Sequence, residues 1–124
     1  MKQEYLLDSN VLIYLGHGNK KIARQLLRLK RPYFFSSVIT YFEILYGCKT
    51  LEEKKLVKQY ANDLAILDLR KEIIEAALEL KEKKKLKFKD LLIAATAQME
   101  GLTLVTADKD FKKIKGLKVK LLNL

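Results

Sequence analysis

Short apolar segments alternate with longer segments of helical periodicity, and this alternation restricts the fold more than any other feature of the sequence. The apolar segments are too short for helices and are typical of buried strands. Strands that alternate with helices favour a parallel sheet, so we predict an α/β fold. The expected strands are residues 5–8, 33–35, 65–67, 103–106 and 118–122. The expected helices cover residues 22–27, 38–46, 72–85 and 91–99.

Turn and cap residues mark several boundaries of these elements. Pro32 is expected in a turn between two apolar segments, and Ser36 or Ser37 is expected to cap the helix that follows. Gly101 is expected to end the last long helix. No linker, repeat or low-complexity segment divides the chain, so residues 1–124 are expected to form one domain.

The charge balance favours a polyanionic partner. The chain has 25 Lys and Arg residues against 15 Asp and Glu residues, a net charge of +10. An excess of this kind in a small domain is typical of nucleic-acid binding. The single cysteine excludes a disulfide framework, and neither a secretory signal nor a membrane-spanning segment is visible. We therefore expect a cytoplasmic protein with no membrane association.

Four acidic side chains fall where an α/β sheet binds its ligands. Asp8 closes the first expected strand, and Asp108 follows the fourth, with Asp110 two residues later. Asp90 opens the most hydrophobic helix of the chain, and Glu43 lies within an otherwise apolar helix. Ligands of open α/β sheets bind beyond the carboxyl ends of the strands. If the first and fourth strands are neighbours, the starts of two helices deliver Asp90 and Glu43 to the same crevice.

Such a cluster of carboxylates needs a counter-charge. Two carboxylates about 4 Å apart repel each other by roughly 4 kcal/mol at an effective dielectric constant of 20. A divalent cation removes this cost, and oxygen ligands without histidine or cysteine favour Mg²⁺ or Mn²⁺ over zinc. A metal ion held by carboxylates suits phosphodiester hydrolysis, because it activates water and stabilises the in-line displacement.

Four segments of the sequence carry a family resemblance. They resemble, in order, the signature blocks of PIN-domain ribonucleases, and most closely those of the VapC toxins of toxin–antitoxin pairs. The segments are LLDSNVLI (6–13), YFEILYG (41–47), KDLLIAATA (89–97) and TLVTADKDF (103–111). The resemblance implies a PIN-like fold, with a central parallel sheet of four to five short strands flanked by helices on both faces.

The resemblance also implies a Mg²⁺- or Mn²⁺-dependent endoribonuclease, with RNA as its substrate. Asp8 and Asp90 would be the main metal ligands, and Glu43 and Asp108 would complete the acidic site directly or through water. Asp110 competes with Asp108 for the position that faces the metal, and Asp108 is preferred because it lies nearer the strand end.

Further residues and partners follow from the same resemblance. Asn10 and Thr106 would orient the metal-binding carboxylates. Apart from the resemblance, the lysine-rich run 81–89 leads into Asp90, which makes Lys87 and Lys89 candidate contacts for the RNA backbone, with a solvated helix end as the alternative, and Lys109 is a further candidate. The family implies a homodimer and a small antitoxin whose C-terminal segment lies across the active-site groove.

Several alternatives stay open at this point. Asp8 has the residue type and position of a helix cap, and Asp90 those of an acid that stabilises a helix N-terminus. Glu43 has a structural alternative as an exposed residue on a helix face. An RNA-binding module without cleavage activity, and a PIN nuclease of RNA or DNA processing with no antitoxin, are the alternative functions.

Overall fold

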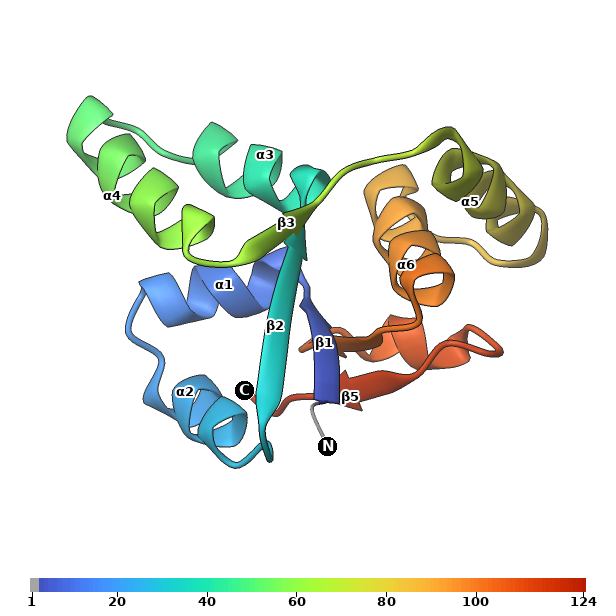
Figure 1. The fold of residues 1–124 in the computed structure, drawn as a ribbon, viewed down its shortest axis with the longest axis horizontal. Coiled ribbons are helices and arrows are strands. Elements are labelled where there is room, and N and C mark those ends of the chain that lie inside the picture. Colours follow the sequence, from blue (N-terminus) through green and yellow to red (C-terminus); the bar gives the residue numbers. More distant parts are fainter. Residues whose placement is uncertain (1–2) are drawn as a thin grey trace.

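Five parallel strands form one sheet with helices on both faces (Figure 1). The computed structural model describes residues 3–124. The strands are β1 (Gln3–Leu7), β2 (Pro32–Ser37), β3 (Ala65–Leu67), β4 (Thr103–Thr106) and β5 (Val119–Leu121), in the order β3-β2-β1-β4-β5. The helices are α1 (Ser9–Gly16), α2 (Lys20–Leu27), α3 (Val38–Tyr46), α4 (Leu51–Asn62), α5 (Lys71–Lys83), α6 (Phe88–Glu100) and the 3-10 helix η1 (Lys109–Lys113).

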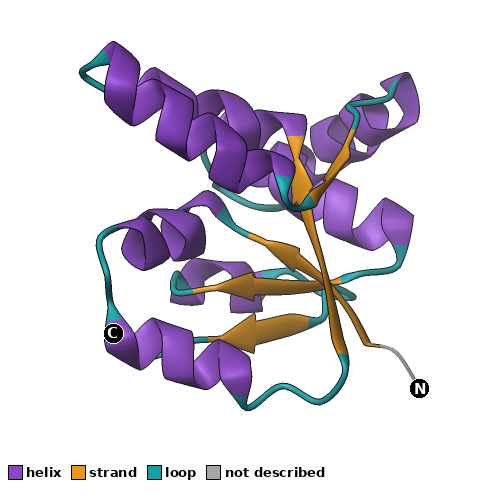
Figure 2. Ribbon diagram, turned by 60° about the vertical axis from the view of Figure 1, so that its left-hand side comes forward, coloured by secondary structure: helices purple, strands orange, loops and turns teal. Residues whose placement is uncertain are grey.

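Alternate side chains of the central strand divide the core between two layers. Tyr5 and Leu7 belong to the apolar cluster that includes Val11 of α1 and also residues of α2. Leu6 points to the other face and packs in a cluster with Ile93 of α6. Helix α5 packs on α6 through a third cluster. Figure 2 shows the strands running through the interior with the helices around them. The predicted α/β fold is confirmed.

The neighbouring strands β1 and β4 create the edge at which the acidic residues meet. Leu7 is paired with Val105 in parallel register, so Asp8 and Thr106 follow at the same end of the sheet. The backbone N–H of Asp8 donates to the carbonyl of Val105 at 2.9 Å. The sequence-based expectation that the first and fourth strands are neighbours is therefore confirmed.

Two local expectations are wrong in position. Pro32 is the first residue of β2 rather than part of a turn. This strand position tolerates proline, which has no N–H to donate. Helix α6 begins at Phe88, three residues before the expected start at Leu91, and Asp90 lies in its first turn, as expected of the acid that opens this helix. Ser37 is the residue that caps α3, and its hydroxyl accepts from the N–H of Thr40.

Helix α4 is absent from the sequence-based expectation. Its large apolar residues Leu51, Leu56 and Tyr60 are exposed, and its core-facing side is short, with Ala61 buried and Val57 packed against the same cluster. Its start does carry a local signal. The hydroxyl of Thr50 accepts from the N–H of the residue three positions later, as in a capping box. Among residues 3–124, no helix has the length and apolar character needed to cross a bilayer.

Candidate active site

Asp8 is the most deeply placed of the four acids. It caps α1, and its side chain is buried at 4% exposure. Its Oδ1 accepts from the N–H of Ser9 at 2.8 Å, and its Oδ2 accepts from the hydroxyl of Thr106 at 2.8 Å. Burial, followed by the charges of Asp90 and Glu43, raises its pKa to about 6 against the opposing effect of these hydrogen bonds. Asp8 therefore caps α1, and at the same time its ionised form is disfavoured by burial and by the neighbouring carboxylates.

Thr106 and Asn10 form a small network that holds Asp8 in place. The Thr106 hydroxyl donates to Asp8 and accepts from the side-chain amide of Asn10 at 3.3 Å and from the N–H of Asp108 at 3.0 Å. Asn10 in turn accepts from the N–H of Ala107 at 3.3 Å. This network joins the start of α1 to the turn after β4. The two residues predicted to orient a carboxylate are brought next to Asp8.

Glu43 reaches the site from the second half of α3, and not from a helix start as expected. Its Oε1 accepts from the hydroxyl of Ser9 at 2.7 Å. Its Oε2 accepts from the ammonium group of Lys89 at 2.7 Å, in an ion pair that joins α3 to α6. The Ser9 hydroxyl also lies 3.4 Å from Oδ1 of Asp8, so this one residue lies between two carboxylates.

Asp90 lies half-buried in the first turn of α6. Burial raises its pKa, and the charges of Asp108 and Glu43 raise it further, whereas the neighbouring Lys89 and Lys87 lower it. These effects require the four acids to lie near one another. Asp8, Glu43, Asp90 and Asp108 are called the acid pocket below.

The turn after β4 separates Asp108 from Asp110. Asp108 caps η1 and accepts from the N–H of Asp110 at 2.9 Å, and its charge acts on Asp90. The carboxylate of Asp110 is half exposed and lies 3.4 Å from the ammonium group of Lys113. Asp108 therefore belongs to the acid pocket, while Asp110 pairs with a lysine on η1.

The three predicted RNA-contacting lysines differ in their surroundings. Lys87 precedes α6 and is exposed, as is Lys109 on η1. Lys89 instead points to Glu43, and this hydrogen bond raises the pKa of the Lys89 ammonium. Sequence reasoning missed both this ion pair and the role of Ser9, because the partners lie 46 and 34 positions apart and share no local pattern.

The acid pocket has the donor chemistry for a hard divalent cation. It contains carboxylates only, and in residues 3–124 Asp8, Asp90 and Asp108 form no ion pair with a basic side chain. Within the same residues, no three His, Cys, Asp or Glu side chains are already arranged to hold a metal ion. The residue types of Asp8, Asp90 and Asp108 fit a divalent cation. Glu43 differs from these three acids, because its carboxylate already forms an ion pair with Lys89.

Comparison with known proteins decides the family. The family model of the PIN domain matches residues 5–117. The chain belongs to the PIN domain family. The PIN-like fold implied by the four sequence blocks is thereby confirmed. Members of this family are nucleases, which places the PIN domain described here among the hydrolases that act on nucleic acids.

Solved structures of toxin–antitoxin complexes resemble this PIN domain over nearly its whole length. A toxin–antitoxin complex from Klebsiella pneumoniae matches with a TM-score of 0.85 and 30% identity, covering 97% of this chain and 99% of the other. VapBC2 from Rickettsia felis, bound to a promoter DNA fragment, matches with a TM-score of 0.82 and 27% identity, covering 98% and 100%. No match was found among curated protein sequences.

Proposed function

We propose that this PIN domain, formed by residues 1–124, is a Mg²⁺- or Mn²⁺-dependent endoribonuclease and the toxin of a toxin–antitoxin pair. The observation that carries the proposal is the acid pocket at the carboxyl ends of β1 and β4, where burial and neighbouring charges raise the pKa of Asp8 and Asp90. Carboxylates under such electrostatic stress are stabilised by a divalent cation. The similarity to toxin–antitoxin complexes supports the biological role.

In the proposed site, different residues bind the metal ion and orient the carboxylates. Asp8, Asp90 and Asp108 would hold the ion, which neutralises their charge and polarises the scissile phosphate when bound. Thr106 fixes one oxygen of Asp8 through its hydroxyl, so the carboxylate keeps a single orientation. Glu43 joins α1 and α6 to α3 through its contacts with Ser9 and Lys89.

The surface around the pocket supports RNA as the substrate. Lys87 and Lys109 flank the acid pocket and are exposed, which suits contacts with a phosphate backbone. The rest of the positive charge is distributed over the molecule, with a net charge of +10. Backbone contacts of this kind release counterions when RNA binds.

The affinity for RNA is therefore expected to fall steeply with salt. For single strands the logarithmic slope is about −0.7 per phosphate contacted, so about four contacts weaken binding roughly 50-fold between about 50 and 200 mM salt. Fluorescence anisotropy with a labelled single-stranded RNA, in EDTA to prevent cleavage, measures this slope. A flat response would exclude the basic surface as the source of affinity.

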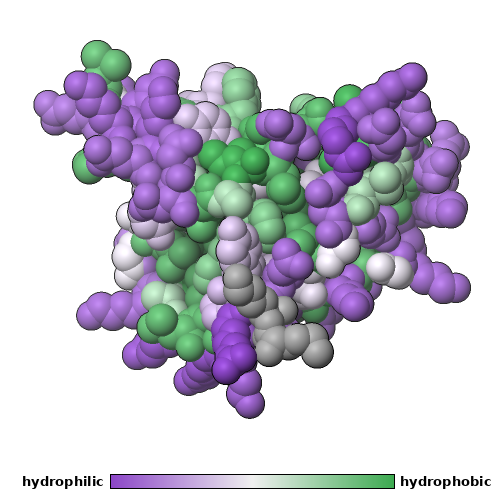
Figure 3. All heavy atoms as spheres, viewed as in Figure 1, coloured by the Kyte–Doolittle hydropathy of each residue, from purple (hydrophilic) through white to green (hydrophobic). Residues whose placement is uncertain are grey.

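Exposed apolar residues support protein partners. Large hydrophobic side chains are exposed on α3, α4 and α5, namely Phe42, Tyr46, Leu51, Leu56, Tyr60, Ile74 and Leu78. In Figure 3 hydrophobic surface lies between the hydrophilic side chains of α4 and α5. Large apolar side chains that are exposed on neighbouring turns of one helix, as Phe42 and Tyr46 are on α3, are common at protein interfaces. This exposed apolar surface supports the homodimer and the small antitoxin, lying across the acid pocket, as the proposed partners.

Cleavage of a labelled cellular RNA pool tests the proposed function. Purified protein is expected to cleave in Mg²⁺ or Mn²⁺ and to be inactive in EDTA. Asp108→Asn is expected to lower the rate at least about 100-fold, because it removes a carboxylate of the pocket. Asp110→Asn, two residues away on the same turn, serves as the matched control and should stay within about threefold of wild type.

The pattern of results separates the alternatives. RNA that is bound but left intact in either metal ion would support the RNA-binding module without cleavage. Equal losses for Asp108→Asn and Asp110→Asn would contradict the assignment of Asp108 to the pocket. Cleavage that an antitoxin encoded by the neighbouring gene abolishes supports the toxin. Cleavage without such a partner supports a processing nuclease.

A further inference from the structure

Lys89 lies next to the acid pocket and pairs with one of its carboxylates. Among residues 3–124, it is the only basic side chain in an ion pair with a carboxylate of the acid pocket. Its ammonium group lies 2.7 Å from Oε2 of Glu43. Lys87, two residues earlier on the same segment, is exposed and forms no such pair. The positive charge next to the acids is therefore built into a specific position on α6.

Glu43 is fully engaged in this arrangement. One of its oxygens accepts from Ser9 and the other from Lys89, each at 2.7 Å. The side chain of Glu43 is 22% exposed and that of Lys89 is 42% exposed, so the ion pair is shielded from water on its Glu43 side. A carboxylate held in this way from two sides has a defined orientation and a compensated charge. It is the one acid of the pocket that already has its cation.

None of the other three acids forms such an ion pair among residues 3–124, although the charges of Lys89 and Lys87 act on Asp90. Asp8 accepts only uncharged donors, and the pKa values of Asp8 and Asp90 are raised by burial and by neighbouring carboxylates. One divalent cation matches the charge of this three-acid set closely. A second ion on the Glu43 side would have to displace an ammonium group that already bonds to the carboxylate.

We propose that Lys89 is a positioning residue that acts as the internal cation of the acid pocket. It holds Glu43, so that a single divalent ion binds to Asp8, Asp90 and Asp108. The inference rests on the proposed function, because it concerns the metal ion that this function requires. It assigns Lys89 to the interior of the site rather than to the RNA backbone.

Calorimetric titration of the metal-free chain with Mn²⁺ tests this proposal without any measurement of activity. Wild type is expected to bind one ion per chain. Lys89→Gln removes the competing cation and is expected to tighten Mn²⁺ binding on the order of tenfold, because a like charge is lost beside the ion. Lys89→Arg keeps the charge and is expected to bind as wild type does.

Lys87→Gln is the matched control, since it removes the same charge two residues away without breaking the ion pair with Glu43. Its effect on Mn²⁺ affinity should be about twofold, and thus smaller than that of Lys89→Gln, because Lys87 acts on Asp90 from an exposed position where its charge is screened. Equal effects of Lys87→Gln and Lys89→Gln, or two ions bound to wild type, would overturn the role of Lys89 alone. Failure of every variant to bind Mn²⁺ would overturn the proposed metal-dependent function as well.

Discussion

Replacing Asp8 by asparagine is expected to abolish RNA cleavage and, at the same time, to raise the stability of the metal-free protein. The loss of activity should reach at least about 10³-fold, because a metal-binding carboxylate supplies several kcal/mol to a metal-assisted step. Stability should rise because the pKa of Asp8 is raised from 3.8 to about 6 in the folded protein. Keeping this carboxylate ionised at neutral pH therefore costs about 3 kcal/mol.

Asparagine preserves the shape of the site but not every hydrogen bond. Its carbonyl oxygen can still accept from the N–H of Ser9, and asparagine is as good a helix cap as aspartate. Its amide would face the hydroxyl of Thr106, which already accepts from Asn10 and from the N–H of Asp108. This crowding offsets part of the gain. The net increase in the free energy of unfolding is expected to be about 1–2 kcal/mol.

The sign of the pH dependence gives an independent check on Asp8. Because its pKa is raised from 3.8 on folding, the unfolded chain releases the proton more readily. The metal-free wild type should lose the stability contributed by the neutral form as pH rises from about 4 to about 6, and the loss should level off above that. The advantage of Asp8→Asn should accordingly vanish near pH 4. Urea unfolding in EDTA at a series of pH values measures the difference.

Asp8→Ala is the matched control for the cap. It also removes the charge, but α1 loses its side-chain cap, which costs about 0.5–2 kcal/mol. It should therefore be less stable than Asp8→Asn while being equally inactive. A metal-free Asp8→Asn protein that is clearly less stable than wild type at neutral pH would contradict the electrostatic account and leave Asp8 as a structural cap.

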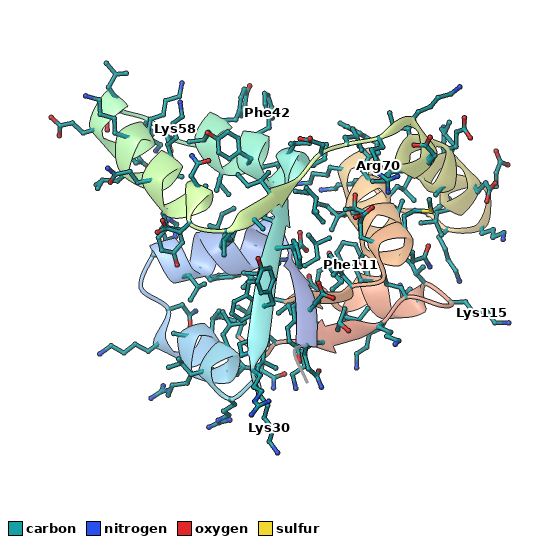
Figure 4. All side chains as sticks on the ribbon, in the orientation of Figure 1. Lys30, Phe42, Lys58, Arg70, Phe111 and Lys115 are labelled. Carbon is teal, nitrogen blue, oxygen red and sulfur yellow. The ribbon has the colours of Figure 1, made fainter. Side chains whose placement is uncertain are left out.

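Truncation of Phe111 to alanine is expected to have the largest effect on stability. Phe111 lies on η1, three residues after Asp108, and is 1% exposed in the cluster formed by α6 and the sheet. In Figure 4 it lies inside the molecule beneath α6. Loss of a buried phenylalanine costs about 3–5 kcal/mol. The turn that carries Asp108 is anchored by this side chain, so cleavage should weaken even where the variant remains folded.

Phe42→Ala provides the matched control, because the same atoms are removed from the outer side of α3 (Figure 4). Phe42 is 65% exposed and stacks only on Tyr46. Its truncation is expected to cost less than about 1 kcal/mol. Chemical denaturation of both variants at low protein concentration compares them. Equal costs would show that the core under η1 contributes no more than a surface contact.

The sheet was predictable because its signals are local. Three apolar residues in a row at 65–67, and Leu104 and Val105 between two β-branched threonines at 103–106, identify strands without knowledge of any partner, and β3 and β4 have these bounds. The positions of Asp8 after β1 and of Asp108 after β4 follow from the same local signals. Helix α4 was not predicted, because its core-facing side is short, with Val57 and Ala61, and its large apolar residues Leu51, Leu56 and Tyr60 are exposed.

The four acids and their order along the chain follow from the sequence alone, since strand ends and helix caps depend on neighbouring residues. Only the tertiary structure brings Lys89 and Ser9 to Glu43 and separates Asp108 from Asp110. The contacts of Glu43 join different helices across the sheet edge, and their geometry depends on how α1, α3 and α6 pack, whereas the Asp110–Lys113 pair is a local contact within η1. No local sequence pattern predicts that Lys89 and Ser9 lie within hydrogen-bond distance of Glu43. The packing of the helices therefore decides which carboxylate of the acid pocket is paired with a positive charge.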